Sequence, residues 1–209
     1  GYDVRIDYGG AYMFIFYYAE KFGVTAVRDL VASTLHGAQS IEDALQNAGY
    51  DLTFNQVYLN WITALSIDEP SFANGTYGFY NLDINMDKST HSIYPKNINN
   101  ILHRFYGFQI NYLSNPPDFL MLNASLPGSS YVLGLSIAVH DTNGWHISNY
   151  LVDTEDPIVI NGTDVIEAYI MSSIMSSSTP YVVADNQFGL GYTEYLETVS
   201  YTHLTLPTK

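Results

Sequence analysis

Cysteine is absent from this chain of 209 residues, and basic residues are few. The lack of cysteine excludes disulfide frameworks, thiolate nucleophiles and cysteine-ligated zinc sites. Seven Lys and Arg against 21 Asp and Glu give a formal net charge of −14. Because nucleic acids are bound largely by neutralising phosphates with cations, this balance argues against nucleic-acid and anionic-membrane partners. No apolar run reaches the roughly 18 residues that a membrane-spanning helix needs.

Apolar and aromatic residues are abundant, at 47% and 15% of the chain. This composition can fill the core of one or two domains. The chain begins with Gly1 and carries no signal peptide, and we interpret it as an internal piece of a longer protein. Its end, TVSYTHLTLPT at 198–208, resembles the translation of a transposase-based sequencing-library adapter. A Thr-rich edge strand is the alternative, but we expect 198–209 to be an artefact tail.

The N-terminal third has the pattern of a helical unit. A run without proline extends from Tyr8 to Phe22 and stops at Gly23, where a left-handed C-cap is expected. Large apolar side chains lie on all sides of this helix, so we expect neighbours to enclose it. Thr25 is a candidate N-cap for a second helix, with Val27, Leu30 and Val31 on its inward face.

Two further helices are indicated by capping signals. Ser40 with Asp43 resembles a capping box at the start of one helix, which Gly49 would end. Thr53 with Gln56 repeats this signal ahead of the apolar segment FNQVYLNWITAL, in which Trp61 is expected to face the opening helix. Residues 1–70 are therefore predicted to form a helical subdomain.

The pattern changes after residue 70. Short segments rich in Tyr, Ile, Val and Phe alternate with turn residues, and DTNGW at 141–145 is a hairpin-turn candidate. The fold class predicted is therefore α+β, with an N-terminal helical subdomain followed by an antiparallel β-sandwich over residues 71–197. The expected strands are YGFYNLDI (77–84), RFYGFQINYL (104–113), YVLGLSIAVH (131–140), WHISNYLV (145–152), PIVI (157–160), DVIEAYIMSS (164–173), YVVAD (181–185) and LGYTEYLE (190–197).

Three Asn-x-Ser/Thr sequons fall in turn-like contexts, at Asn74, Asn123 and Asn161. Such sequons accept N-linked glycans in exported proteins. Together with the lack of cysteine and the low lysine content, they favour an extracellular or cell-surface protein with glycans at these asparagines.

Three segments carry a resemblance to a known family: YGGAYMFIFYYAEKFG (8–23), SIEDALQNAG (40–49) and the region 52–82. They resemble the part that follows the zinc site in secreted HExxH metallopeptidases of the gluzincin type, in particular hyicolysin-like and immune-inhibitor-like proteins. Those proteins continue from a Tyr-Gly-x-x-Tyr-Leu-Phe helix to a Phe-x-x-x-Phe-x-x-Trp motif and a C-terminal β domain. The matching residues here are Tyr8, Gly9, Tyr12, Met13, Phe14, Phe54, Tyr58 and Trp61.

The resemblance covers about a third of the chain and implies the C-terminal fragment of an exported zinc-dependent peptidase. A catalytic zinc needs three protein ligands and an adjacent general base, and the chain has no HExxH. The resemblance therefore implies that zinc is bound by residues before Gly1, and that this fragment alone does not hydrolyse peptides. Outside the tail, the histidines are His36, His91, His103, His140 and His146. His140 and His146 flank the predicted turn with Asp141, where polar hairpin residues are favoured over metal ligands.

Tyr8 is the one residue here for which the resemblance implies a catalytic role. In related aminopeptidases a tyrosine in a Tyr-x-x-Gly/Ala pattern donates a hydrogen bond to the developing oxyanion, and Tyr8 with Ala11 has that spacing. The favoured alternative is that Tyr8 only packs over Gly9 and Gly10.

Two clusters have both a binding and a structural interpretation. An acidic group suits Ca²⁺ but lacks EF-hand spacing, so a solvated loop is favoured; it comprises Asp153, Glu155, Asp156 and Asp164. A set of strand tyrosines suits a carbohydrate or peptide platform, but core packing is favoured; it comprises Tyr106, Tyr112, Tyr131, Tyr150 and Tyr169. The alternative function is accordingly a non-enzymatic extracellular binding or adhesion module.

Overall fold

The fold is α+β, with helices first and strands after them, as the sequence predicts. The computed structural model describes residues 4–94, 96–103, 106–125, 131–152, 157–176 and 190–198. Within these ranges the helices are α1 (Val4–Ala32), α2 (Ala38–Asn47) and α3 (Phe54–Ile67), followed by a short 3₁₀ turn (Ala73–Gly75). The strands are β1 (Ser89–His91), β2 (Lys96–His103), β3 (Phe108–Ser114), β4 (Phe119–Ser125), β5 (Tyr131–Asp141), β6 (Gly144–Val152), β7 (Ile158–Asn161), β8 (Glu167–Ser176) and β9 (Leu190–Thr198).

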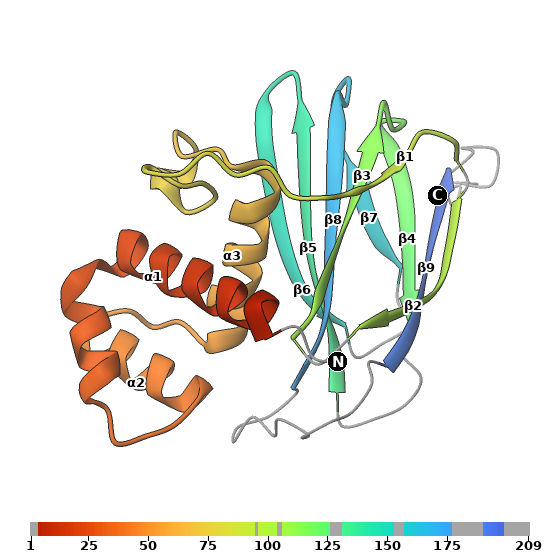
Figure 1. Cartoon of the computed structure of the whole chain (residues 1–209). Helices are drawn as coiled ribbons and strands as arrows, with labels where there is room; N and C mark the ends of the chain where they lie inside the picture. The colour runs from red at the N-terminus through yellow and green to blue at the C-terminus, as the bar shows by residue number, and fades with distance from the viewer. Residues whose placement is uncertain are drawn as a thin grey trace, which may run out of the picture.

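The strands form two sheets that lie face to face. One has the order β1-β3-β8-β5-β6 and the other the order β2-β9-β4-β7. All pairs are antiparallel except β1 with β3. The helices lie on the outer face of the five-stranded sheet (Figure 1), so that sheet is the middle of three layers.

Strand β5 has both faces buried, because the second sheet covers one and α3 the other. Its large alternating residues, such as Leu133 and Leu135, belong to the core between the sheets. The residues at the intervening positions, on the face toward α3, are small. A Cβ added to Gly134 would overlap the sulfur of Met175. These small residues let α3 approach the strand closely. The alternation of large and small side chains along β5 therefore corresponds to two buried faces.

A buried hydrogen bond joins α3 to β5. The hydroxyl of Thr63 donates to the Leu59 carbonyl at 2.7 Å, so its single proton is already used. The Ser136 hydroxyl must therefore donate to Thr63 Oγ1, at 2.5 Å. Both side chains are fully buried, and each supplies the partner that the other needs.

The start of α3 confirms the predicted capping box. Thr53 Oγ1 accepts from the Gln56 amide, and the Gln56 side chain accepts from the Thr53 amide. The box predicted at Ser40 and Asp43 is wrong. Ser40 lies inside α2, whose N-cap is Gly37, and its hydroxyl donates back to the Gly37 carbonyl.

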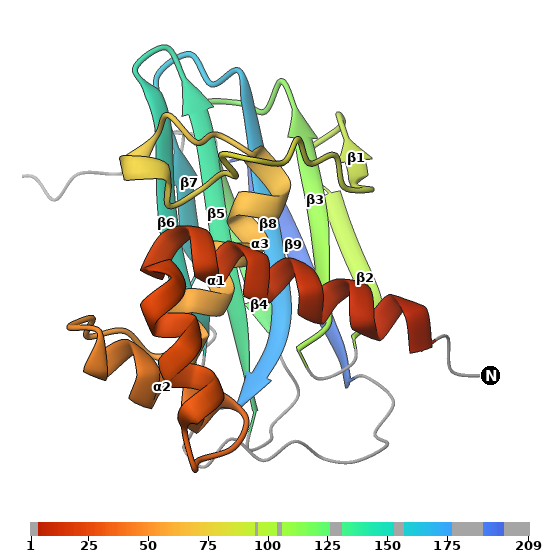
Figure 2. The same cartoon turned by 60° about the vertical axis from the view of Figure 1, so that its left-hand side comes forward.

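Helix α1 differs from the prediction in its burial. The break at Gly23 is present, with φ 83° and ψ 164°. However, the expectation of a helix enclosed on all sides is wrong, because Tyr12 is 63% and Ile15 39% exposed among the described residues. Of the three residues expected to face inward after Gly23, Val27 and Leu30 pack against the core, but Val31 is 82% exposed. Only the side that carries Tyr17 and its neighbours is covered, since no layer lies outside α1 in the described structure (Figure 2).

Residues 77–84 do not form the predicted strand but cross the helical side of the molecule as an irregular segment that includes a turn and bends (Figure 2). The backbone amides of this segment donate hydrogen bonds to carboxylates instead of to the carbonyls of a neighbouring strand. Asp68 accepts from Phe79 N and Ile84 N, both at 2.8 Å. Glu20 accepts from Tyr80 N at 3.1 Å. The β propensity of this segment is therefore overridden by long-range side-chain contacts.

The remaining strand predictions have mixed outcomes. The hairpin at 141–145 is confirmed, since Asp141 pairs with Gly144 across a two-residue turn between β5 and β6. Strands β1, β2 and β4 are not among those expected. Strand β9 includes Thr198, one residue beyond the predicted boundary at 197. The predicted strand at 181–185 and the tail at 199–209 lie outside the described residues.

Asp141 ties this hairpin to the connection between β7 and β8. Its carboxylate accepts from Thr163 N at 2.9 Å, from Asn143 N at 2.7 Å and from His146 Nε2 at 3.1 Å. The Thr163 amide, followed by the Asn143 amide and His146, lowers the pKa of Asp141 to about 2. The ionised form is therefore the one that holds the loops together.

We predict that Asp141→Asn lowers the melting temperature at neutral pH, because the amide cannot accept all three hydrogen bonds. A depressed folded-state pKa stabilises the protein above the ordinary value of 3.8, and this contribution disappears as the pH falls through 2. The difference in melting temperature between the wild type and the variant should therefore shrink between pH 4 and pH 2. Thermal unfolding followed by circular dichroism measures it, with Asp164→Asn as an exposed control. A difference independent of pH would contradict this role.

Candidate functional site

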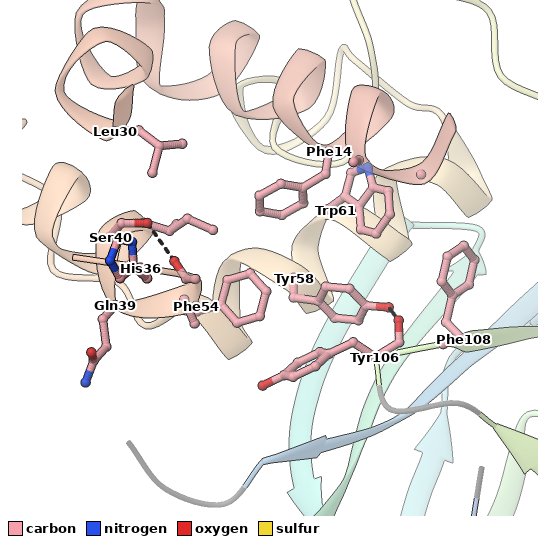
Figure 3. A pocket seen from close by; sticks show the side chains of 16 residues that line it. Phe14, Leu30, His36, Gln39, Ser40, Phe54, Tyr58, Trp61, Tyr106 and Phe108 are labelled. Carbon is pink, nitrogen blue, oxygen red and sulfur yellow. Dashed lines mark hydrogen bonds between the residues drawn. The ribbon is translucent and has the colours of Figure 1, made fainter. Parts of the chain in front are cut away.

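A cavity of about 710 Å³ lies between the helical unit and the start of β3. Its lining comes from α1, the start of α2, α3 and residues 106–108, which are far apart in the sequence (Figure 3). Six aromatic side chains contribute to it: Phe14, Phe54, Tyr58, Trp61, Tyr106 and Phe108. Apolar cavities of this size are the usual form of small-molecule sites in proteins.

The spacing of residues on α3 builds one wall of this cavity. Phe54, Tyr58 and Trp61 recur at intervals of four and three, so they share one helix face. Trp61 packs edge-on against Phe14 of α1, with ring centroids 5.4 Å apart and planes at 88°. It also lies 5.8 Å from the ring of Phe108. The prediction that Trp61 faces the opening helix is therefore confirmed.

The tyrosine hydroxyls of this wall are used in structural hydrogen bonds. Tyr58 donates to the Tyr106 carbonyl at 2.6 Å, and Tyr106 donates to Asn55 Oδ1 at 2.7 Å. Burial raises the pKa of Tyr58, so its hydroxyl stays a neutral donor. The Tyr106 amide donates to the Ile174 carbonyl at 2.9 Å, which anchors this segment to β8. These hydrogen bonds therefore fix the positions of the Tyr58 and Tyr106 rings in the cavity wall.

Trp61 carries a buried donor that lacks a partner. Its side chain is 6% exposed, and the indole N–H makes no hydrogen bond within the part of the chain that the structure describes. Figure 3 shows the indole nitrogen on the edge of the ring turned toward α1. A buried unsatisfied donor costs about 1–3 kcal/mol.

The rim of the cavity is formed by small and polar residues. They are Gly10 and Ala11 of α1, His36 ahead of α2 and Gln39 in its first turn, whereas Ser40 lines the cavity from a buried position. No Asp, Glu, Lys or Arg is among the described residues that line the cavity. The cavity therefore suits apolar contact better than acid–base chemistry.

Tyr8, the predicted catalytic residue, lies in the second turn of α1, but its side chain is outside the described part of the structure. The adjacent Gly9 and Gly10 are exposed. No described atom lies within 4 Å of a Cβ placed on either glycine. The two interpretations of Tyr8 therefore both stay predictions.

The histidines are dispersed and have different partners. His140 Nδ1 lies 3.4 Å from Glu167, His146 pairs with Asp141, and His91 Nε2 lies 3.0 Å from Asn111 Oδ1. His36 is on the cavity rim, and the side chain of His103 is not described. Among the residues whose positions are described, no group of three or more His, Asp or Glu could hold a metal ion.

The other two predicted clusters are only partly described. Of the acidic cluster, Asp164 is exposed on a turn, and the rest lies outside the described residues. The tyrosine set packs into the cores wherever its side chains are described, as expected; these are Tyr106, Tyr112, Tyr150 and Tyr169.

The cavity itself is not anticipated by the sequence interpretation. Tyr106 and Phe108 belong to a segment predicted as a strand. Phe108 does begin β3 and Tyr106 precedes it, but both also line the cavity next to α3. The density of aromatic residues in RFYGF is a signal that could have singled them out.

No protein-family model matches the chain, and no curated protein matches it significantly. Within the described ranges, no helix has the length and apolar character required to cross a membrane.

We predict that Trp61→Ala lowers the free energy of unfolding by about 3–5 kcal/mol, because it leaves a hole among three aromatic rings. Trp61→Phe should cost less, since it keeps a ring in contact with Phe14 and removes the unsatisfied N–H. Chemical denaturation of both variants measures the difference. Equal losses for Ala and Phe would contradict the packing role.

Proposed function

We propose that the chain is the C-terminal part of an exported zinc metallopeptidase, a hydrolase of peptide bonds. The observation that carries the proposal is the packing of the Phe54, Tyr58 and Trp61 face of α3 against Phe14 of α1. These residues belong to the segments that resemble the family, and they meet in one aromatic cluster. A β-sandwich follows, as in the resembled proteins.

The described residues do not fit a zinc site, because no group of three potential ligands lies together among them. Under this proposal zinc is held entirely by residues outside this chain. The contribution of the chain would come from α1. Tyr12 and Ile15 leave an exposed apolar surface on this helix, which an adjoining part of a longer protein could cover.

Tyr8 has the role of oxyanion donor in this proposal. It lies in the second turn of α1, one turn after the helix begins at Val4. A neutral phenol there can donate a hydrogen bond to the oxygen that becomes negative when a peptide carbonyl is attacked. Removing one such donor typically lowers the rate by about 10²–10³-fold.

Export and glycosylation are part of the same proposal. The sequon asparagines Asn74 and Asn161 are both exposed, as a glycan acceptor must be. Asn123 lies in β4, and its side chain is not described. Glycans at these positions would be detected as a mass shift removed by an endoglycosidase.

A second candidate function is a non-enzymatic extracellular binding module. The observation that favours it is the aromatic cavity, which the described chain forms from its own residues.

The peptidase proposal predicts zinc-dependent peptide hydrolysis by the protein expressed together with the coding sequence upstream of Gly1. In that protein Tyr8→Phe should lower kcat by about 100-fold with KM nearly unchanged, because the lost hydrogen bond forms mainly in the transition state. Tyr12→Phe, at an exposed tyrosine one turn later, is the matched control and should be fully active. Full activity of Tyr8→Phe would exclude the oxyanion role. Lack of zinc-dependent hydrolysis by the longer protein would contradict the proposed function itself.

A further inference from the structure

We propose that the aromatic cavity binds a small uncharged molecule with an aromatic or aliphatic body. The lining residues on which this proposal rests are all described, and the proposal does not depend on the peptidase proposal. Its volume of about 710 Å³ lies within the range of 300–1,000 Å³ typical of small-molecule pockets.

The walls offer apolar contact and few hydrogen bonds. The hydroxyls of Tyr58 and Tyr106 already donate to protein oxygens, and the Ser40 hydroxyl donates to the Gly37 carbonyl. A ligand in the cavity therefore meets mainly ring edges, ring faces and aliphatic groups such as the Leu30 side chain (Figure 3). Burial of apolar surface is the main source of affinity that such walls supply.

The lining also determines the charge of the ligand. An ionic site would be marked by Asp, Glu, Lys or Arg side chains, and none of these is among the described residues that line the cavity. His36 is among the lining residues and is exposed. An anionic group that entered would lose its hydration and would find no Lys or Arg in the described lining to pair with. The lining therefore selects against anionic ligands.

Gly10 marks the opening of the cavity. Glycine inside a helix is less favourable than alanine, so Gly9 and Gly10 weaken α1. No described atom comes within 4 Å of a Cβ at either position, so close packing against the described residues does not require them. Gly10 lines the cavity and Gly9 does not. A large side chain at position 10 would stand in the opening.

The experiment uses the whole chain and the neutral fluorescent probe N-phenyl-1-naphthylamine. Saturable enhancement of probe emission is expected, with quenching of Trp61, which lies in the cavity wall. The chain has two tryptophans, and Trp145 lies outside the lining, stacked on His140. The background variant Trp145→Phe therefore assigns the quenching to Trp61.

Two glycine variants form a matched pair. Gly10→Leu should weaken probe binding at least tenfold, whereas Gly9→Leu should bind as the wild type does. Both replacements improve helix propensity equally and meet no described atom within 4 Å, so both should keep the fold. Circular dichroism and the melting temperature check this. Ala11→Leu, at the other small rim residue, should reproduce the loss seen with Gly10→Leu.

A charged relative of the probe tests the ligand class. 1-Anilinonaphthalene-8-sulfonate has the same ring system with a sulfonate added, and it should bind at least tenfold more weakly. Equal binding of the two probes would overturn the proposed selectivity. No saturable binding of the neutral probe, or equal affinity of the two glycine variants, would overturn the site. These results are obtained without zinc or upstream sequence, so they leave the peptidase proposal to its own test.

Discussion

The contact between α3 and the five-stranded sheet is the one on which the rest of the structure depends. Small residues of β5 let the helix approach, and the hydrogen bond between Ser136 and Thr63 satisfies two buried hydroxyls at this contact. Once α3 is fixed there, its other face presents Phe54 and Trp61 to Phe14 of α1. The cavity is therefore a consequence of how one helix covers the sheet.

Carboxylates of this acidic chain also accept hydrogen bonds from backbone amides that have no partner in a neighbouring strand. Asp68 and Glu20 hold the segment 77–84 in this way. Lys21 assists them, because its ammonium group donates to the Gly78 carbonyl at 2.6 Å, and burial lowers its pKa. The segment is thereby fixed over the helices without belonging to a sheet.

Several structural features that depend on local interactions were predicted correctly from the sequence. The Thr53–Gln56 capping box, the hairpin at 141–145 and the helical spacing of Trp61 all depend on residues close in sequence. Contacts between residues distant in sequence, such as Glu20 with Tyr80, decide which side of α1 is buried, which path residues 77–84 take and where the cavity lies. Apolar residues occur on every side of α1, so its sequence could not show which side would be buried. The buried side depends on where α3 and the sheet pack against the helix.

The central claim is that α3 makes the helical unit and the β-sandwich one cooperative structure. Native-state hydrogen exchange followed by mass spectrometry tests it most directly, by comparing the free energy of opening for amides in α3 with that for amides in β5. The account predicts that the two elements share the highest opening free energy and exchange together. Exchange of α3 at a clearly lower free energy, with β5 still protected, would contradict it.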